Sequence, residues 1–290
     1  MPGMQIYNNI QSMNSQRALG SATARLGGTL EKLSTGLRVN KGGDDAAALA
    51  ISEILRSDIR SFEQAVRNTG DAVSVVNIAE GSLSEQTGIL TRMRELAIEA
   101  SNFTFTSAQR TTVDGEFQQL KDEMDRISLV TNFNGRALLN GSMCSAAVAL
   151  GIAGAPMVAQ VDIDNNAQSQ INLNNYIDIT NMDVTGLGLS TTSVTTSDNA
   201  VSALAFIDTA IDYITARRGS LGAVTNRLEN TISNLEVVIE NNTAADSRLR
   251  DADMAKEMSK FTRDQILVQT GTSMLAQANQ LPTSILKLIG

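Results

Sequence analysis

The sequence near the C-terminus reads LVQTGTSMLAQANQLPTSILKL over residues 267–288, and near the N-terminus it reads LGSATARLGGTLEKLSTGL over residues 19–37. In both stretches apolar or small residues recur at alternating intervals of four and three, which places them on one stripe of a helix. The positions of this C-terminal seam are Leu267, Gly271, Met274, Ala278, Leu281, Ile285 and Leu288. The positions of the N-terminal seam are Leu19, Thr23, Leu26, Leu30, Leu33 and Leu37.

Both seams lie at the ends of the chain, where most proteins are polar and frayed. An apolar helical stripe needs a partner, so we expect the two ends themselves to be interaction surfaces. The simplest arrangement is a chain that runs out and back, so that its two halves pair antiparallel as a helical rod. This pattern indicates assembly and not catalysis.

The composition agrees with helix packing. Of 290 residues, 42% are hydrophobic but only 3% are aromatic, and Trp is absent. Such a chain fills helix interfaces with aliphatic side chains and not with large rings. The 11 methionines add adaptable packing groups.

Charge and residue usage argue against several classes of protein. The net charge is −8 and the 23 basic residues form no dense run, so nucleic acid and anionic membranes are not expected partners. With no His, the commonest general base and metal ligand is missing. The single Cys144 has no His to activate it. No signal peptide and no apolar run of membrane-spanning length are visible.

The periodic pattern divides the chain into five segments. Helices are predicted over residues 4–38, 46–101, 108–130 and 199–241, with a loop after Asn241-Asn242 and a last helix from 246 onward. Pro282 should bend this last helix or mark a boundary. We expect the domains to be terminal helices 1–45 and 246–290, rod segments 46–140 and 199–245, and an insert 141–198.

The insert loses the helical period. Just before it, Asn134-Gly135 predicts a tight hairpin turn. Short β-like stretches follow over 158–163 and 171–179, and the Ser/Thr-rich residues 190–197 are predicted to form a surface loop. The expected fold class is therefore mainly α, with a β-hairpin and a small β-rich outer unit.

One possible metal motif fails on inspection. Asp162, Asp164 and Asn166 resemble the start of a calcium loop, but Ala167 stands where the loop needs Gly and Leu173 where it needs Glu. No phosphate-binding GxxxxGK motif is present either. No cofactor, metal or catalytic residue is expected, and an enzyme is the weakest hypothesis.

Several longer motifs resemble the bacterial flagellins over roughly residues 1–140 and 199–290. The N-terminal motifs are LSTGLRVN at 33–40, DDAA at 44–47, RMRELA at 92–97 and FNG at 133–135. The C-terminal motifs are SRLRDADMA at 247–255, QIL at 265–267 and MLAQANQ at 274–280.

The resemblance implies a structural subunit that polymerises into an extracellular flagellar filament and supports swimming. In that family the terminal helices line the innermost tube and the insert faces solvent. The resemblance also implies unfolded export through the flagellar type III apparatus, a chaperone at the C-terminal helix, and contacts with cap and hook-junction proteins.

The family also carries a surface that is read by Toll-like receptor 5. By resemblance its positions are Arg92, Leu96 and Glu116, although Gly115 departs from the surrounding pattern. The alternative is that Arg92 and Glu116 serve contacts between subunits.

Two other functions stay open at this point. A hook–filament junction protein shares similar termini but would not form long filaments from seeds. A secreted adhesin or signalling module would use the insert, so deletion of 141–198 would affect host-cell attachment and not motility. The sequence leaves open the protofilament number, the handedness, and glycosylation of the insert.

Overall fold

The structure is a computed structural model that describes residues 9–141, 157–163, 166–173 and 181–289, with the backbone alone for 167 and 281–289. The chain divides into two compact units. Unit 1 comprises Met1–Ile59 with Glu240–Gly290, and unit 2 comprises Arg60–Ile239. Long helices dominate both units, which confirms the mainly α fold class.

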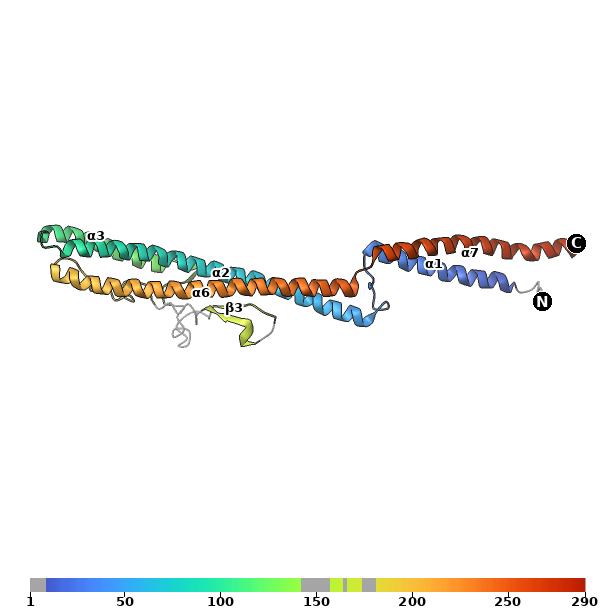
Figure 1. Cartoon of the computed structure of the whole chain (residues 1–290), viewed down its shortest axis with the longest axis horizontal. Helices are drawn as coiled ribbons and strands as arrows, with labels where there is room; N and C mark the ends of the chain where they lie inside the picture. The colour runs from blue at the N-terminus through green and yellow to red at the C-terminus, as the bar shows by residue number, and fades with distance from the viewer. Residues whose placement is uncertain (1–8, 142–156, 164–165, 174–180, 290) are drawn as a thin grey trace. The chain divides into compact units, whose positions relative to one another are not determined.

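Unit 1 is built around the helices α1 (Ile10–Thr35) and α7 (Met254–Ile289), which lie side by side in Figure 1. Asn9 contacts Ala278, Arg25 contacts Asp264, and Leu37 pairs with Asp251 in an isolated antiparallel bridge. Residue numbers rise along α1 as they fall along α7, so the two helices are antiparallel. The prediction that the two chain ends pair is therefore confirmed.

Local signals explain where these helices begin and end. Asn9 caps α1, since its side-chain oxygen accepts a hydrogen bond from the backbone N–H of Ser12. Gly36 ends α1 in the left-handed conformation, with φ of 72°. Asp253 caps the start of α7 by accepting a bond from the N–H of Lys256.

Unit 2 contains α3 (Ser107–Val130) and most of α2 (Ala46–Ser101) and α6 (Ser197–Arg250). Gly70 and Gly81 do not interrupt α2. Ion pairs join α2 to α6 through Glu80 and Arg218 at 2.7 Å and through Arg94 and Asp208 at 2.8 Å. A capping box between Thr106 and Gln109 starts α3.

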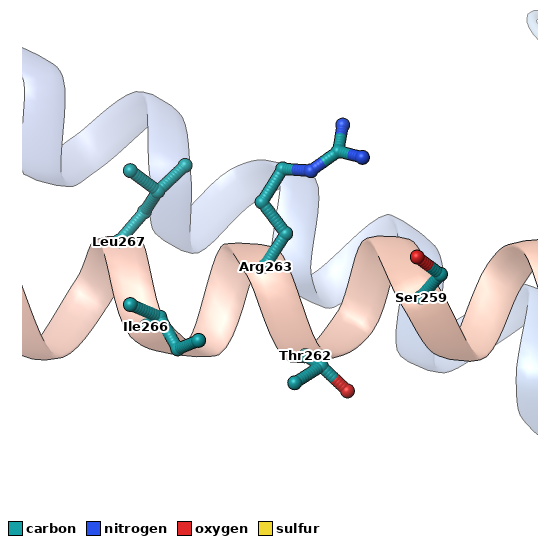
Figure 2. A pocket seen from close by; sticks show the side chains of 5 residues that line it. All are labelled: Ser259, Thr262, Arg263, Ile266 and Leu267. Carbon is teal, nitrogen blue, oxygen red and sulfur yellow. The ribbon is translucent and has the colours of Figure 1, made fainter.

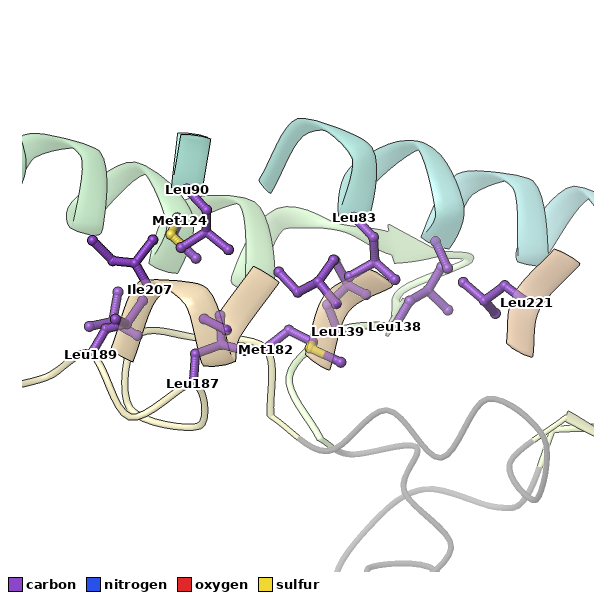
Figure 3. Packing of buried hydrophobic residues seen from close by; sticks show 14 of the residues in the cluster. Leu83, Leu90, Met124, Leu138, Leu139, Met182, Leu187, Leu189, Ile207 and Leu221 are labelled. Atoms are coloured by element: carbon purple, nitrogen blue, oxygen red, sulfur yellow. The ribbon is translucent and has the colours of Figure 1, made fainter. Parts of the chain in front are cut away.

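The core of unit 2 is large and apolar, as Figure 3 shows. Leu83 and Leu90 of α2 meet Met124 of α3, Ile207 of α6 and Leu139, and all five are completely buried. Full burial of one such side chain is worth roughly 1.5–3 kcal/mol. Unit 2 therefore has a large apolar core within the single chain.

The predicted hairpin is present. Strand β1 (Asn132–Phe133) pairs antiparallel with β2 (Arg136–Ala137). The turn residues Asn134 and Gly135 have φ of 51° and 77°. Both central residues need a positive φ in this type of turn, which is why the Asn-Gly pair predicted it.

Part of the insert is described. Strand β3 (Val158–Gln160) pairs antiparallel with β4 (Gln170–Asn172), which follows the short helix η1 (Ala167–Ser169). This agrees with the predicted β-like stretches up to residue 172. Cys144 and Asp164 lie outside the described residues.

Three local predictions were wrong in whole or in part. Helix α6 continues through Asn241-Asn242 to Arg250, and the break comes at residues 251–253. Asn lowers helix propensity by less than about 1 kcal/mol, which packing easily overrides. The loop forms instead where the backbone of Arg250 and Ala252 bonds to residues 36–39.

The other two corrections concern Pro282 and the Ser/Thr-rich residues. Helix α7 runs on to Ile289, so Pro282 marks no boundary, and the alternative that it bends the helix stays a prediction. Within residues 190–197, Thr192 and Val194 are buried. Thr192 satisfies its own hydroxyl by donating to the carbonyl of Leu189 at 2.7 Å, so this stretch packs against the core and is not a free surface loop.

Candidate functional site

The pairing of α1 with α7 is the candidate site, and small residues lie at its centre. On α1, Ala22 and Thr29 are buried. Leu19, Leu26 and Leu33 are half-buried beside them. These five residues form the contact face of α1 and recur at intervals of three and four, as a helix pair requires.

Only part of the N-terminal seam lies in the contact with α7. Leu30 is 49% exposed and Thr23 is also exposed, while Ala22 and Thr29 take their places in the contact. Leu37 lies beyond the end of α1, where it bridges to Asp251. A helix pair approaches most closely along its smaller side chains, so the larger Leu30 is turned outward.

The same shift occurs on α7. Ala278 is buried and Gly271 is half-buried, as the seam predicted. Leu267 and Met274 are 43% and 58% exposed, and the half-buried Val268 and Leu275 occupy the contact instead. We call Val268, Gly271, Leu275 and Ala278 the contact face of α7. The side chains of Leu281, Ile285 and Leu288 lie outside the described part of α7.

Polar groups also cross the contact. Arg25 approaches the Asp264 carboxylate at 3.4 Å, and Ser12 Oγ donates to Asn279 Oδ1 at 2.8 Å. Asp264 is 7% exposed, so it is largely shielded from water. A charged or polar group within a helix contact weakens it but restricts the registers that the helices can adopt.

Large apolar side chains remain uncovered around this pair. We call them the outer apolar set: Ile10, Met13 and Leu30 on α1, with Ile266, Leu267 and Met274 on α7. Ile266 and Leu267 also line an open hollow of about 480 Å³ with Ser259, Thr262 and Arg263 (Figure 2). Exposed apolar residues at this density are typical of a surface that binds another protein.

The buried apolar side chains of unit 1 are much smaller than those of unit 2. Among the described residues, the buried apolar side chains of unit 1 are Ala22, Val39, Ala48 and Ala278, none larger than valine. In unit 2 they include several leucines and methionines, together with Phe117, that have no exposed area. The described part of unit 1 therefore has no large apolar core in the single chain.

A network of carboxylates holds the turn between α1 and α2. Glu31 accepts bonds from Lys41 Nζ at 2.8 Å and from Asn40 Nδ2 at 2.9 Å. Asp44 Oδ2 accepts bonds from the backbone N–H groups of Asn40 and Lys41, both at 3.1 Å.

These bonds favour the ionised forms of both acids. The bond from Lys41 chiefly lowers the pKa of Glu31, and the two backbone N–H groups lower the pKa of Asp44. The Glu31 carboxylate in turn raises the pKa of Lys41.

Two of the three residues assigned to a receptor surface by resemblance lie together. Arg92 on α2 contacts Glu116 on α3 at 2.9 Å and Glu95 at 3.0 Å, and all three are exposed. Hydrogen bonds to Glu95 and Glu116 raise the pKa of Arg92. Leu96 is only 2% exposed. The expectation that Leu96 lies on the surface was wrong, because it belongs to the buried apolar cluster of unit 2.

Charged residues of α3 hold the segment 184–194 by hydrogen bonds, which the sequence did not lead us to predict. Asp114 accepts from the N–H of Val194, Asp125 accepts from the N–H of Val184, and Lys121 Nζ donates to the carbonyls of Ser190 and Thr192. Burial lowers the pKa of Lys121. Asp114, Lys121 and Asp125 lie on one face of α3, and this helical spacing of charged residues could have predicted a polar contact.

Within the described residues, no cluster of three or more Asp, Glu or Cys side chains is placed to hold a metal ion. None of the described helices is both long and apolar enough to cross a membrane.

Comparison with known proteins matches both helical parts of the chain. The family model of the bacterial flagellin N-terminal helical region matches residues 6–143, and that of the C-terminal helical region matches residues 204–289. A flagellin of Halalkalibacterium halodurans is 42% identical, covering 99% of this chain and 100% of the relative. A flagellin of Bacillus subtilis is 41% identical with the same coverage.

Among solved structures, one of a putative flagellar hook-associated protein from Vibrio parahaemolyticus is similar with a TM-score of 0.57. The similarity covers 72% of this chain and 100% of that chain at 14% identity, so it is a likeness of fold.

Proposed function

This chain belongs to the bacterial flagellins and is a structural subunit of the flagellar filament, and from that premise we propose that neighbouring copies complete the burial that α1 and α7 leave unfinished. The family is structural and not enzymatic. The filament is a bacterial surface appendage formed by self-association of its subunits.

One observation carries the proposal. The outer apolar set is exposed around a helix pair whose buried apolar residues, in the described part of the chain, are only Ala22 and Ala278. Burial of apolar area is worth roughly 25 cal/mol per Å². A polymer that covers Leu30, Leu267 and Met274 on every copy gains this energy at each repeat, whereas the isolated chain leaves it unused.

The contact residues assigned from the sequence then fall into two groups. Leu19, Leu26, Leu33 and Ala278 hold α1 against α7 within one copy. Leu30, Leu267 and Met274 contact neighbouring copies, and Leu281, Ile285 and Leu288 continue this interface by sequence. The inner-tube position of the terminal helices remains part of this proposal.

Polar substitution on the exposed side tests it. Leu267→Ser and Met274→Ser alter side chains that are already 43% and 58% exposed, so the folded monomer should tolerate them. We expect the double variant to remain monomeric when wild-type seeds are added. Gln277→Ser on the exposed side of the same helix is the matched control and should assemble normally. Normal filaments from the double variant would refute the proposal.

We also infer that a cytosolic export chaperone holds α7 before the chain leaves the cell through the flagellar type III apparatus. The exposed Ile266, Leu267 and Met274 support this, because they would otherwise invite premature association. The cap and hook-junction proteins are expected to meet the same helices at the filament ends. Binding of purified α7 peptide to the cognate chaperone, weakened by Leu267→Ser, would test the first contact.

Recognition by Toll-like receptor 5 is a second proposal. The exposed Arg92–Glu116 pair at 2.9 Å supports it, since it presents a fixed charged feature across α2 and α3. The buried Leu96 would act by holding this part of α2 in place. A reporter-cell assay with purified monomer should give activation that Arg92→Ala lowers. No activation at high dose would dismiss this proposal and leave the pair to subunit contacts.

A further inference from the structure

The side chain of Asn9 contacts both terminal helices at once. Its Oδ1 atom accepts the backbone N–H of Ser12 at 3.0 Å and so caps α1. Its Nδ2 group donates to the carbonyl oxygen of Ala278 in α7 at 2.8 Å. The same amide therefore starts one helix and reaches into the backbone of the other.

The carbonyl of Ala278 is open to such a donor because of Pro282. In an α-helix, the carbonyl of residue 278 would accept from the N–H of residue 282, but proline has none. The proline ring also crowds the carbonyl four residues earlier. Helix α7 nevertheless continues to Ile289, so a backbone acceptor is left without its helical donor at this point. Asn9 supplies the missing bond.

The small residues of the contact specify register only weakly, so its polar contacts carry most of that information. Its buried small residues are Ala22, Thr29 and Ala278, with Gly271 beside them, and the buried Asp264 lies 3.4 Å from Arg25. Small side chains at a seven-residue repeat fit about equally well after one helix slides by a heptad. Polar contacts at single positions are the known means of removing this ambiguity.

We propose that Asn9 and Pro282 together form a register lock that positions α1 against α7. This deepens the proposed function and rests on it, because the register determines which apolar side chains each copy presents to its neighbours. Asn9 is a positioning residue here, and Pro282 is what makes its bond to α7 possible.

Asn9→Asp separates this role from simple capping. Aspartate keeps the oxygen that caps α1 and suits a helix N-terminus, but it lacks the Nδ2 donor. A capping role alone predicts that Asn9→Asp is neutral or favourable. The register lock predicts that it weakens the pairing of the two helices.

Pro282→Ala provides the matched background. Alanine restores an N–H that can bond to the carbonyl of Ala278, so the Asn9 amide becomes dispensable. Where Pro282 is kept, Asn9→Asp should raise the critical concentration for seeded filament growth about fivefold, which corresponds to the loss of one hydrogen bond. In the Pro282→Ala background it should leave the critical concentration unchanged.

Cross-linking reads the register directly, in a Cys144→Ser background. Cysteines at Ser12 and Asn279, whose side chains are bonded at 2.8 Å, report the observed register. Cysteines at Ser12 and Thr272 report a slip of one heptad. Asn9→Asp should lower the first cross-link and raise the second, and Pro282→Ala should cancel this difference.

The outcomes are separable. Equal effects of Asn9→Asp in both backgrounds, or no change in either cross-link, would overturn the register lock while leaving filament formation intact. Failure of the unmodified chain to assemble, while the variant with Ser12→Cys and Asn279→Cys still forms its cross-link, would count against the proposed function instead.

Discussion

Leu19 packs so closely over Gly271 that a β-carbon added to residue 271 would lie 3.2 Å from Leu19 Cδ1. This is the tightest approach of α1 to α7 at any glycine of the described helices. Glycine is unfavourable in a helix interior by about 1 kcal/mol relative to alanine. Its presence here is explained by the space that the leucine needs.

Gly271→Val should therefore weaken the pairing of the terminal helices. Overpacking of this kind costs roughly 1–3 kcal/mol, and we expect the critical concentration for filament growth to rise accordingly. Sedimentation of polymer across a concentration series measures the change. Gly222→Val in α6 is the control, since no atom lies within 4 Å of a β-carbon added there. An equal effect of both variants would point to helix propensity and not to close packing.

Removal of residues 275–290 should leave a folded, soluble monomer that cannot polymerise. The deletion takes away Leu275, Ala278 and Asn279, which contact α1, but leaves the core of unit 2 untouched. Thermal unfolding should still show the transition of unit 2, and seeded assembly should be absent. Filaments of ordinary length from the truncated chain would contradict this expectation.

Leu83→Ala should destabilise unit 2 strongly. Leu83 has no exposed area, and truncation of a buried leucine to alanine costs about 2–5 kcal/mol. Urea unfolding of the monomer measures the loss. Leu129→Ala is the matched control, because Leu129 is 68% exposed and its truncation should change stability by less than about 0.5 kcal/mol.

Acid should loosen the turn between α1 and α2. The pKa values of Glu31 and Asp44 are lower in the folded chain than their ordinary values of 4.5 and 3.8. Stability from such groups is fully present above the ordinary pKa and is lost as the pH falls through the folded pKa. Hydrogen exchange at the amides of Asn40 and Lys41 should therefore lose protection below about pH 4.

Asp44→Asn tests the origin of this acid effect. The asparagine oxygen can still accept the two backbone bonds, but it does not titrate in this range. Protection of the Asn40 and Lys41 amides should then change much less between pH 6 and pH 3. Of the opposing charges, Lys41 is exposed and Lys32 is half-buried, so added salt should shrink the effect in the parent chain. An unchanged acid profile in Asp44→Asn would assign the effect to other groups.

Most of the fold could be predicted from local sequence. The 3.5-residue period located α2 and α3 to within a residue, and Asn134-Gly135 specified the hairpin because both positions need a positive φ. The family motifs at both ends also identified the kind of molecule. These features depend on residues close together in the chain, where propensity, caps and turn geometry act directly.

The sequence by itself determined that the two ends are long helices with apolar stripes. Only the tertiary structure decided which residues of each stripe turn inward. Ala22 and Thr23 are neighbours, and either one fits an alternation of three and four with the leucines. The close approach of α7 to Leu19 at Gly271 decides between them, and Ala22 is the one that is buried. The end of α6 was likewise decided by contacts between residues 36–39 and 250–252, which are more than two hundred positions apart. A helical period defines a stripe, but the shape of the opposing helix selects its centre.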